Sequence, residues 1–217
     1  MNELTLEVLK ERLELGEELI AGKDKMLEPQ DLPGRYGRVV KAIDGVLQAI
    51  KCEAVMAGGW AVWRHGFFAR MTQDIDIVLP ADRIDEFLRA ASVSGFTVLT
   101  EVPGRWRKVQ HEETKVQVDI LPEGGRPGTK SNLAPTAIPH PGTLGAAGSL
   151  LRYINLPALI ELKLAAGRAR DESDVTERMG VQPEQADVIR KHLATVHPRY
   201  VEDFDRLVKR AREQEDM

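Results

Sequence analysis

Two aspartates separated by a single residue, Asp74 and Asp76, have the chemistry of a metal site. In an extended segment, residues two apart point to the same side, so both carboxylates share a face while Ile75 and Ile77 face the other way. Mg²⁺ takes oxygen ligands and is often held by one or two carboxylates together with substrate phosphates. Adjacent carboxylates without a cation also raise each other's pKa. The pair therefore predicts a site for Mg²⁺ or Mn²⁺, and the alternative is an ordinary solvated strand end.

A glycine pair upstream of these aspartates is suited to approach phosphate. Residues 54–57 read as a short buried strand, and Gly58 and Gly59 can form a sharp turn that leaves amide groups free. A short helix from Trp60 onward would then direct its N-terminal amides at an anion. A glycine pair alone would be an ordinary turn. The order of strand, glycine pair, helix, Thr72 and acid pair is what favours a phosphate site.

Asp119 supplies a third carboxylate. Residues 115–121 alternate between apolar and polar side chains, with Gln117 and Asp119 on the polar face. If this strand lies beside the one that carries Asp74 and Asp76, the three acids form a cluster. Three carboxylates can hold two metal ions, an arrangement that stabilises both the attacking and the leaving oxygen in phosphoryl transfer. Without such neighbours, Asp119 would be a surface acid.

Together these motifs resemble the nucleotidyltransferase superfamily, whose small bacterial members include antibiotic adenylyltransferases and AbiEii-type toxins of toxin–antitoxin pairs. The string GGWAV at residues 58–62, followed by DIDI at residues 74–77, is similar to aminoglycoside and lincosamide adenylyltransferases. The string from Leu159 to Asp174 looks more like the AbiEii-related group. The resemblance covers roughly residues 53–180. Many superfamily members have a serine directly after the first glycine, whereas this chain, like the antibiotic-modifying and some AbiEii-like members, has a second glycine.

The resemblance implies a reaction and a set of residue roles. The reaction is the metal-dependent transfer of a nucleotidyl group from a nucleoside triphosphate to an acceptor, which in the AbiEii-like group is RNA or protein. An antitoxin would then be a partner. The metal ligands and catalytic acids implied are Asp74, Asp76 and Asp119, with Asp119 also helping to activate the acceptor hydroxyl. The nucleotide-binding residues implied are Gly58, Gly59, Thr72, Lys163, Arg170 and Asp174.

The downstream part of the resemblance falls on a predicted helix. On a continuous helix, Lys163, Arg170 and Asp174 would lie within about 20 degrees of one direction, because offsets of seven and eleven residues are near whole turns. Gly167 is a point at which this helix could be interrupted. The resemblance assigns Lys163 to the nucleotide phosphates and either Asp171 or Asp174 to a supporting acid. The alternative is an exposed helix with spaced charges.

Hydrophobic periodicity predicts an α/β protein with a mixed sheet, and the resemblance implies that this sheet is nucleotidyltransferase-like. The expected division is an N-terminal helical extension (1–52), an α/β core (53–155) and a C-terminal helical region (156–217). Residues 122–149 are rich in Gly, Pro, Ser and Thr and read as one long loop that could close over a substrate. The expected helices are 3–21, 35–51, 60–67, 82–94, 157–167, 171–179, 183–195 and 198–214, and the expected strands are 53–57, 74–79, 96–100, 105–111 and 115–121.

Composition is that of a small globular enzyme. The chain has 217 residues, of which 42% are hydrophobic, enough for a sizeable core. A single cysteine, Cys52, excludes an internal disulfide and suits a reducing compartment. The acidic opening and the lack of long apolar stretches predict a cytoplasmic protein without a membrane segment. The net charge of −4 argues against broad nucleic-acid binding.

Several functions share this motif set. We favour the AbiEii-like reading because the string from Leu159 to Asp174 is longer and more specific than GGWAV. The alternatives are an antibiotic adenylyltransferase and a non-catalytic nucleotide-binding or interaction protein with the same fold. A glycosyltransferase with an Asp-x-Asp metal site is less consistent, since those enzymes usually place a larger nucleotide-binding region before the motif.

Overall fold

The computed structural model describes residues 10, 13, 14, 16, 17, 27–66, 72–99, 106–129, 132–146 and 148–215. The helix expected at residues 3–21 lies largely outside these ranges, as do residues 67, 100 and 105 at the ends of other expected elements. Within the described ranges, no helix is both long enough and apolar enough to cross a membrane.

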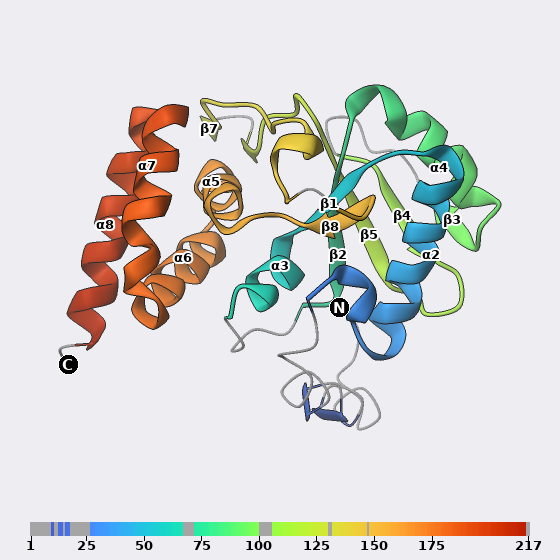
Figure 1. Cartoon of the computed structure of the whole chain (residues 1–217), viewed down its shortest axis with the longest axis horizontal. Coiled ribbons are helices and arrows are strands. Elements are labelled where there is room, and N and C mark those ends of the chain that lie inside the picture. The colour runs from blue at the N-terminus through green and yellow to red at the C-terminus, as the bar shows by residue number, and fades with distance from the viewer. Residues whose placement is uncertain are drawn as a thin grey trace.

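A six-stranded mixed sheet lies at the centre of the molecule (Figure 1). Its strands, in spatial order, are β3 (Phe96–Val98), β4 (Lys108–His111), β5 (Gln117–Pro122), β2 (Asp74–Leu79), β1 (Ala54–Ala57) and β8 (Leu151–Tyr153). Strand β2 runs parallel to β5, and β1 runs parallel to β8, while the other neighbours are antiparallel. The sheet confirms the predicted α/β class and the predicted pairing of β4 with β5.

One face of the sheet packs against α2 (Gly34–Ile50) and α4 (Ile84–Ser92). Alternation along β2 sends Ile75, Ile77 and Leu79 into this core, so its even-numbered residues face the other way. Helix α2 contributes an apolar stripe with helical spacing, which includes Val39, Ile43 and Val46. The α2 helix matches the prediction for residues 35–51.

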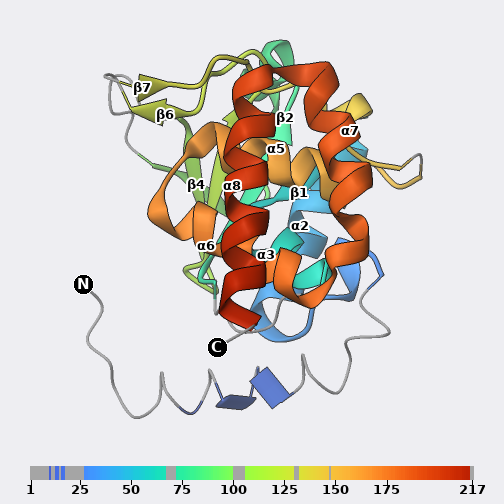
Figure 2. The same cartoon turned by 90° about the vertical axis from the view of Figure 1, so that its left-hand side faces the viewer.

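The short helix α3 (Gly58–Arg64) contacts both cores, since Trp60 packs with the α2 residues and Val62 packs with the residues on the other side of the sheet. The C-terminal helices lie on the side of the sheet away from α2 (Figure 1). These are α5 (Leu156–Ala166), α6 (Ala169–Val181), α7 (Ala186–Val196) and α8 (Pro198–Glu215). Helix α5 has two packing partners, since Leu159 packs with the sheet residues and Ile160 packs with the bundle. Figure 2 shows α7 and α8 side by side on the face of the bundle away from the sheet. All four predicted C-terminal helices are confirmed within a few residues.

Residues 122–149 are more structured than predicted. They contain a two-stranded sheet, β6 (Gly128–Thr129) with β7 (Asn132–Leu133), and a 3₁₀ turn at Pro141–Thr143. Strand β8 follows and was also missed, because three residues are too few to show a period. It forms through pairing with β1, where the Ala54 amide donates to the Leu150 carbonyl oxygen at 2.8 Å.

Candidate active site

The three predicted acids lie on neighbouring strands and on one face of the sheet. Asp74 and Asp76 belong to β2 and Asp119 belongs to β5. In the parallel register of these two strands, Asp76 is directly opposite Asp119. The expectation that the strand of Asp119 runs beside the strand of the acid pair is therefore confirmed.

Asp76 is the most strongly perturbed of these acids. Burial raises its pKa to about 7, and the charges of Asp74 and Asp119 add to this effect. Lys163 and Arg168 act in the opposite direction. A carboxyl that is buried beside two like charges is stabilised in its ionised form by a cation. The donor chemistry at this place therefore fits Mg²⁺ or Mn²⁺, for which one or two carboxylates plus substrate phosphates suffice.

Asp119 is already paired with a lysine. Nζ of Lys108 lies 2.6 Å from Oδ1 and 2.7 Å from Oδ2 of Asp119. Over the described part of the chain, no three Asp, Glu, His or Cys side chains are gathered closely enough to enclose a metal ion. Sequence reasoning did not identify Lys108 as a partner of Asp119, because the pairing depends on the register of β4 and β5. Asp74 and Asp76 on β2 are thus the acids of the cluster whose carboxylates are available to bind a cation.

The glycine pair begins helix α3, which corrects the prediction that it forms a turn before a helix starting at Trp60. The helix begins at Gly58, which has a φ of +63°, with Ala57 as its N-cap. A Cβ on Gly58 would lie 1.8 Å from Oδ2 of Asp76, and a Cβ on Gly59 would lie 2.6 Å from Cβ of Thr72. Both glycines are required here because the first turn of α3 packs directly against β2 and the residues before it.

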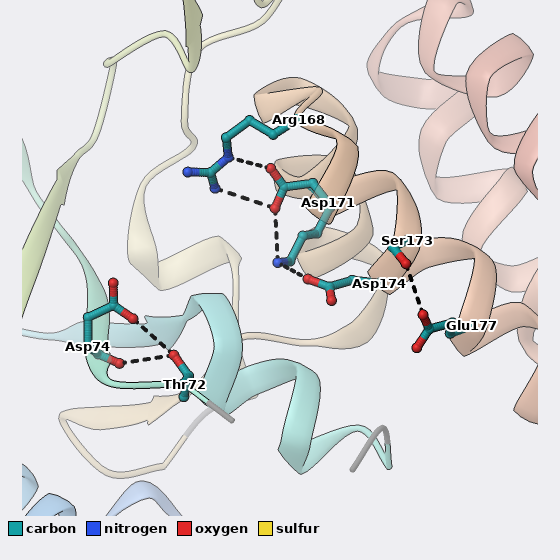
Figure 3. A network of polar contacts seen from close by, with 8 residues as sticks. Thr72, Asp74, Arg168, Asp171, Ser173, Asp174 and Glu177 are labelled. Carbon is teal, nitrogen blue, oxygen red and sulfur yellow. Dashed lines mark hydrogen bonds and ion pairs between the residues drawn. The ribbon is translucent and has the colours of Figure 1, made fainter. Parts of the chain in front are cut away.

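Thr72 holds one member of the acid pair. Its hydroxyl donates to Oδ1 of Asp74 at 2.9 Å, as Figure 3 shows. Thr72 is itself buried, and its hydroxyl is the donor because an ionised carboxylate can only accept. The contact orients the Asp74 carboxylate and leaves its second oxygen available to another ligand.

The C-terminal residues of the predicted site are arranged differently from the prediction. Gly167, with a φ of +60°, ends α5, and α6 begins at Ala169, so the helix is interrupted at Gly167 and Lys163 lies on a different helix from Arg170 and Asp174. The chain folds back instead. Nζ of Lys163 lies 3.0 Å from Oδ1 of Asp171 and 2.5 Å from Oδ2 of Asp174, and all three side chains are buried. Arg170 is exposed and makes none of these contacts.

Arg168 is a cation of this region that the predicted site did not include. Its Nε donates to Oδ2 of Asp171 at 2.6 Å, and its side chain is 75% exposed (Figure 3). Burial alone would raise the pKa of Asp171, but Arg168 and Lys163 together lower it. The pKa of Arg168 is raised by its bond to Asp171 and also by the charges of Asp76 and Asp74. Arg168 thus stands within electrostatic reach of the acid pair.

Residues 39–131 match the family of aminoglycoside-2''-adenylyltransferases. Among solved structures, ANT(2'')-Ia in complex with adenylyl-2''-tobramycin is similar, with 16% identity and a TM-score of 0.42 over 82% of this chain and 97% of that chain. A protein described as a nucleotidyltransferase, from Thermotoga maritima, has 17% identity and a TM-score of 0.42 over 74% of this chain and 93% of that chain. A search of curated sequences gave no match. The matched residues contain Asp74, Asp76 and Asp119, and the family match supports a nucleotidyltransferase.

Proposed function

We propose that this chain transfers a nucleotidyl group from a nucleoside triphosphate to a hydroxyl of an acceptor and releases pyrophosphate. The observation that carries the proposal is the position of Asp76 directly opposite Asp119 on adjacent strands, with Asp74 on the same face. The family match over residues 39–131 supports the same reaction.

Asp74 and Asp76 would hold Mg²⁺ or Mn²⁺ through their carboxylate oxygens, and Asp119 would complete the metal site once its ion pair with Lys108 opens. When bound, the metal ion supplies positive charge that offsets the negative charge of the triphosphate. Thr72 keeps Asp74 in position through its hydroxyl. Gly58 allows the first turn of α3 to lie against Asp76, so a phosphate at the acids would also be near the amides of that turn.

Asp119 would serve as the base toward the acceptor. The acceptor oxygen attacks the α-phosphorus, its proton passes to a carboxylate oxygen of Asp119, and the bond from the α-phosphorus to the leaving oxygen breaks. Pyrophosphate then leaves. Most of the rate enhancement in such a reaction comes from positioning and electrostatics, which rigid strands such as β2 and β5 can provide.

We reassign the phosphate-binding roles that were predicted for residues of the C-terminal helices. Lys163 is buried and held by two carboxylates, so we assign it to keeping Asp171 and Asp174 in place. Asp171 in turn fixes Arg168, whose exposed side chain is the better candidate to meet the triphosphate. The predicted nucleotide contact of Arg170 stays a prediction.

An aminoglycoside is the first candidate acceptor. The family match supports it, and the net charge of −4 suits the approach of a polycationic amino sugar. The second candidate is RNA or protein, in a toxin with an antitoxin partner. Its support is the resemblance of the string from Leu159 to Asp174 to the AbiEii-related group.

The test is label transfer from each of the four α-³²P-labelled nucleoside triphosphates with Mg²⁺ or Mn²⁺. The acceptors are an aminoglycoside and lincosamide panel, total RNA, and cell protein. Labelled aminoglycoside would establish the first candidate, and labelled RNA or protein would establish the second. Nucleotide binding without transfer to any acceptor would instead favour a non-catalytic protein with this fold.

A further inference from the structure

Lys108 is placed to control the third acid of the site. Lys108 and Asp119 are directly opposite each other on the antiparallel strands β4 and β5. Nζ contacts both carboxylate oxygens, at 2.6 and 2.7 Å. Because both residues belong to regular strands, this contact is set by the sheet register and does not depend on a loop.

The ammonium group of Lys108 competes with a metal ion for the carboxylate of Asp119. Because Nζ lies within 2.7 Å of both oxygens of Asp119, its positive charge repels a divalent cation that approaches them. Lys163 and Arg168 also lower the pKa of Asp76, but each is bonded to acids of α6. Lys108 is therefore the cation that directly offsets the charge of the cluster at Asp119.

The exposure of the pair allows the lysine to leave. The side chain of Lys108 is 40% exposed, and that of Asp119 is 23% exposed. Ion pairs with this degree of exposure contribute little net stability, because water replaces the lost contact. The long, flexible stem of lysine can carry the ammonium group into solvent while the strand stays in place.

We propose that Lys108 is an internal counter-ion that a divalent cation must displace from Asp119. The lysine then sets the affinity of the site for the metal. Lys108 also neutralises the charge of the Asp119 carboxylate while no metal ion is bound, and it moves away from this carboxylate when a metal ion binds. This inference rests on the metal site of the proposed function, and Lys108 is a positioning residue in it, acting through Asp119.

The first experiment measures Mn²⁺ binding to the nucleotide-free protein by electron paramagnetic resonance. Removal of the competing ammonium group in Lys108→Met should tighten Mn²⁺ binding about tenfold. Lys115→Met, which removes an exposed lysine from the same hairpin, should leave the affinity unchanged. In an Asp119→Asn background, Lys108→Met should have no effect. Lys108→Gln provides a second variant if the methionine lowers the melting temperature.

The second experiment follows the lysine itself. Reductive methylation of the wild-type protein, read by mass spectrometry, should label Lys108 several times faster with saturating Mn²⁺ than without it. Labelling of Lys115 should not change.

Equal or weaker Mn²⁺ binding by both Lys108 variants would overturn the inference, as would metal-independent labelling of Lys108. Tighter binding that persists in the Asp119→Asn background would also overturn it, because the lysine would then act on another group. Failure of the proposed function is distinguishable, since it appears as missing nucleotidyl transfer in the wild-type protein. Transfer with no effect of Lys108 on Mn²⁺ binding removes only the role of Lys108.

Discussion

Gly58 lies so close to Asp76 that a Cβ on the glycine would come within 1.8 Å of Oδ2 of the aspartate. Gly58 also has a φ of +63°, a conformation that L-residues with a side chain seldom adopt. The first turn of α3 can therefore meet the central acid of the site only because residue 58 is a glycine. This contact links the two motifs, GG and DID, that the sequence shows sixteen residues apart, at positions 58 and 74.

Gly58→Ala should have a larger effect on nucleotide binding than on the stability of the fold. We expect a loss of about 2 kcal/mol in the free energy of unfolding from the left-handed backbone and the clash. Displacement of Asp76 should weaken Mg²⁺-dependent nucleotide binding by at least about tenfold. Calorimetry and urea unfolding measure the two effects. Gly45→Ala is the matched control, because Gly45 lies in the middle of α2 with no atom near its added Cβ, and it should stabilise the protein by about 0.5–1 kcal/mol.

Lys163→Met should destabilise the protein. The change leaves Asp171 and Asp174 buried without the ammonium group that they share, and breaking a buried ion pair from one side costs about 3 kcal/mol or more. Urea unfolding at neutral pH checks this. Lys191→Met, at an exposed position on α7, should change the free energy of unfolding by less than about 0.5 kcal/mol. If Lys163→Met and Lys191→Met had the same free energy of unfolding, the ion pairs of Lys163 with Asp171 and Asp174 would not stabilise the fold.

Protonation of His65 in the unfolded chain should lower the free energy of unfolding in weak acid. Burial lowers its pKa from 6.5 to about 4, and Nε2 lies 2.8 Å from the carbonyl oxygen of Ile154, to which it donates. Below pH 6.5 the unfolded chain takes up a proton at this residue that the folded protein refuses, so stability falls as the pH drops from 6.5 toward 4. Between pH 7.5 and 5.0 this amounts to about 2 kcal/mol.

The control is His65→Gln, which keeps an N–H donor for Ile154 but does not titrate. Unfolding free energies of both proteins at the two pH values isolate the contribution of the histidine from that of the carboxyl groups. A drop of the same size in the variant would contradict the assignment.

Asp119→Asn should abolish nucleotidyl transfer and retain part of the nucleotide binding. An amide cannot accept the acceptor's proton, whereas Asp74 and Asp76 remain able to hold the metal ion. The free energy of unfolding should change by no more than about 1 kcal/mol, because the ion pair with Lys108 is partly exposed. Undiminished transfer of the label in this variant would refute the role of Asp119 as the base.

Much of this architecture follows from local patterns. Alternation in DIDIVL and in KVQVDIL correctly placed Asp74 with Asp76, and Gln117 with Asp119, on one face of each strand, and the structure shows that the two strands are neighbours. Helical spacing located α2 and the four C-terminal helices, and the start of α5 is capped by Asn155, whose side chain accepts from the Ala158 amide. These features depend on residues close together in the chain.

Features that depend on tertiary packing were missed. Strand β8 exists through its pairing with β1, and the start of α3 at Gly58 depends on its approach to Asp76. The turn after Gly167 brings Lys163 into contact with Asp171 and Asp174 of the next helix, a contact that the sequence did not predict. Once the chain folds back there, Lys163 becomes buried and Arg168 becomes the exposed cation.

Calorimetry of nucleotide binding tests the central claim most directly. With Mg²⁺ and a nucleoside triphosphate, the wild-type protein should bind nucleotide, and chelation of the metal or Asp74→Ala should each weaken that binding at least about tenfold. The account predicts that the chelator has no further effect on Asp74→Ala. Equal affinity of the wild-type protein, the chelated sample and the variant would contradict a metal-dependent nucleotide site at Asp74 and Asp76.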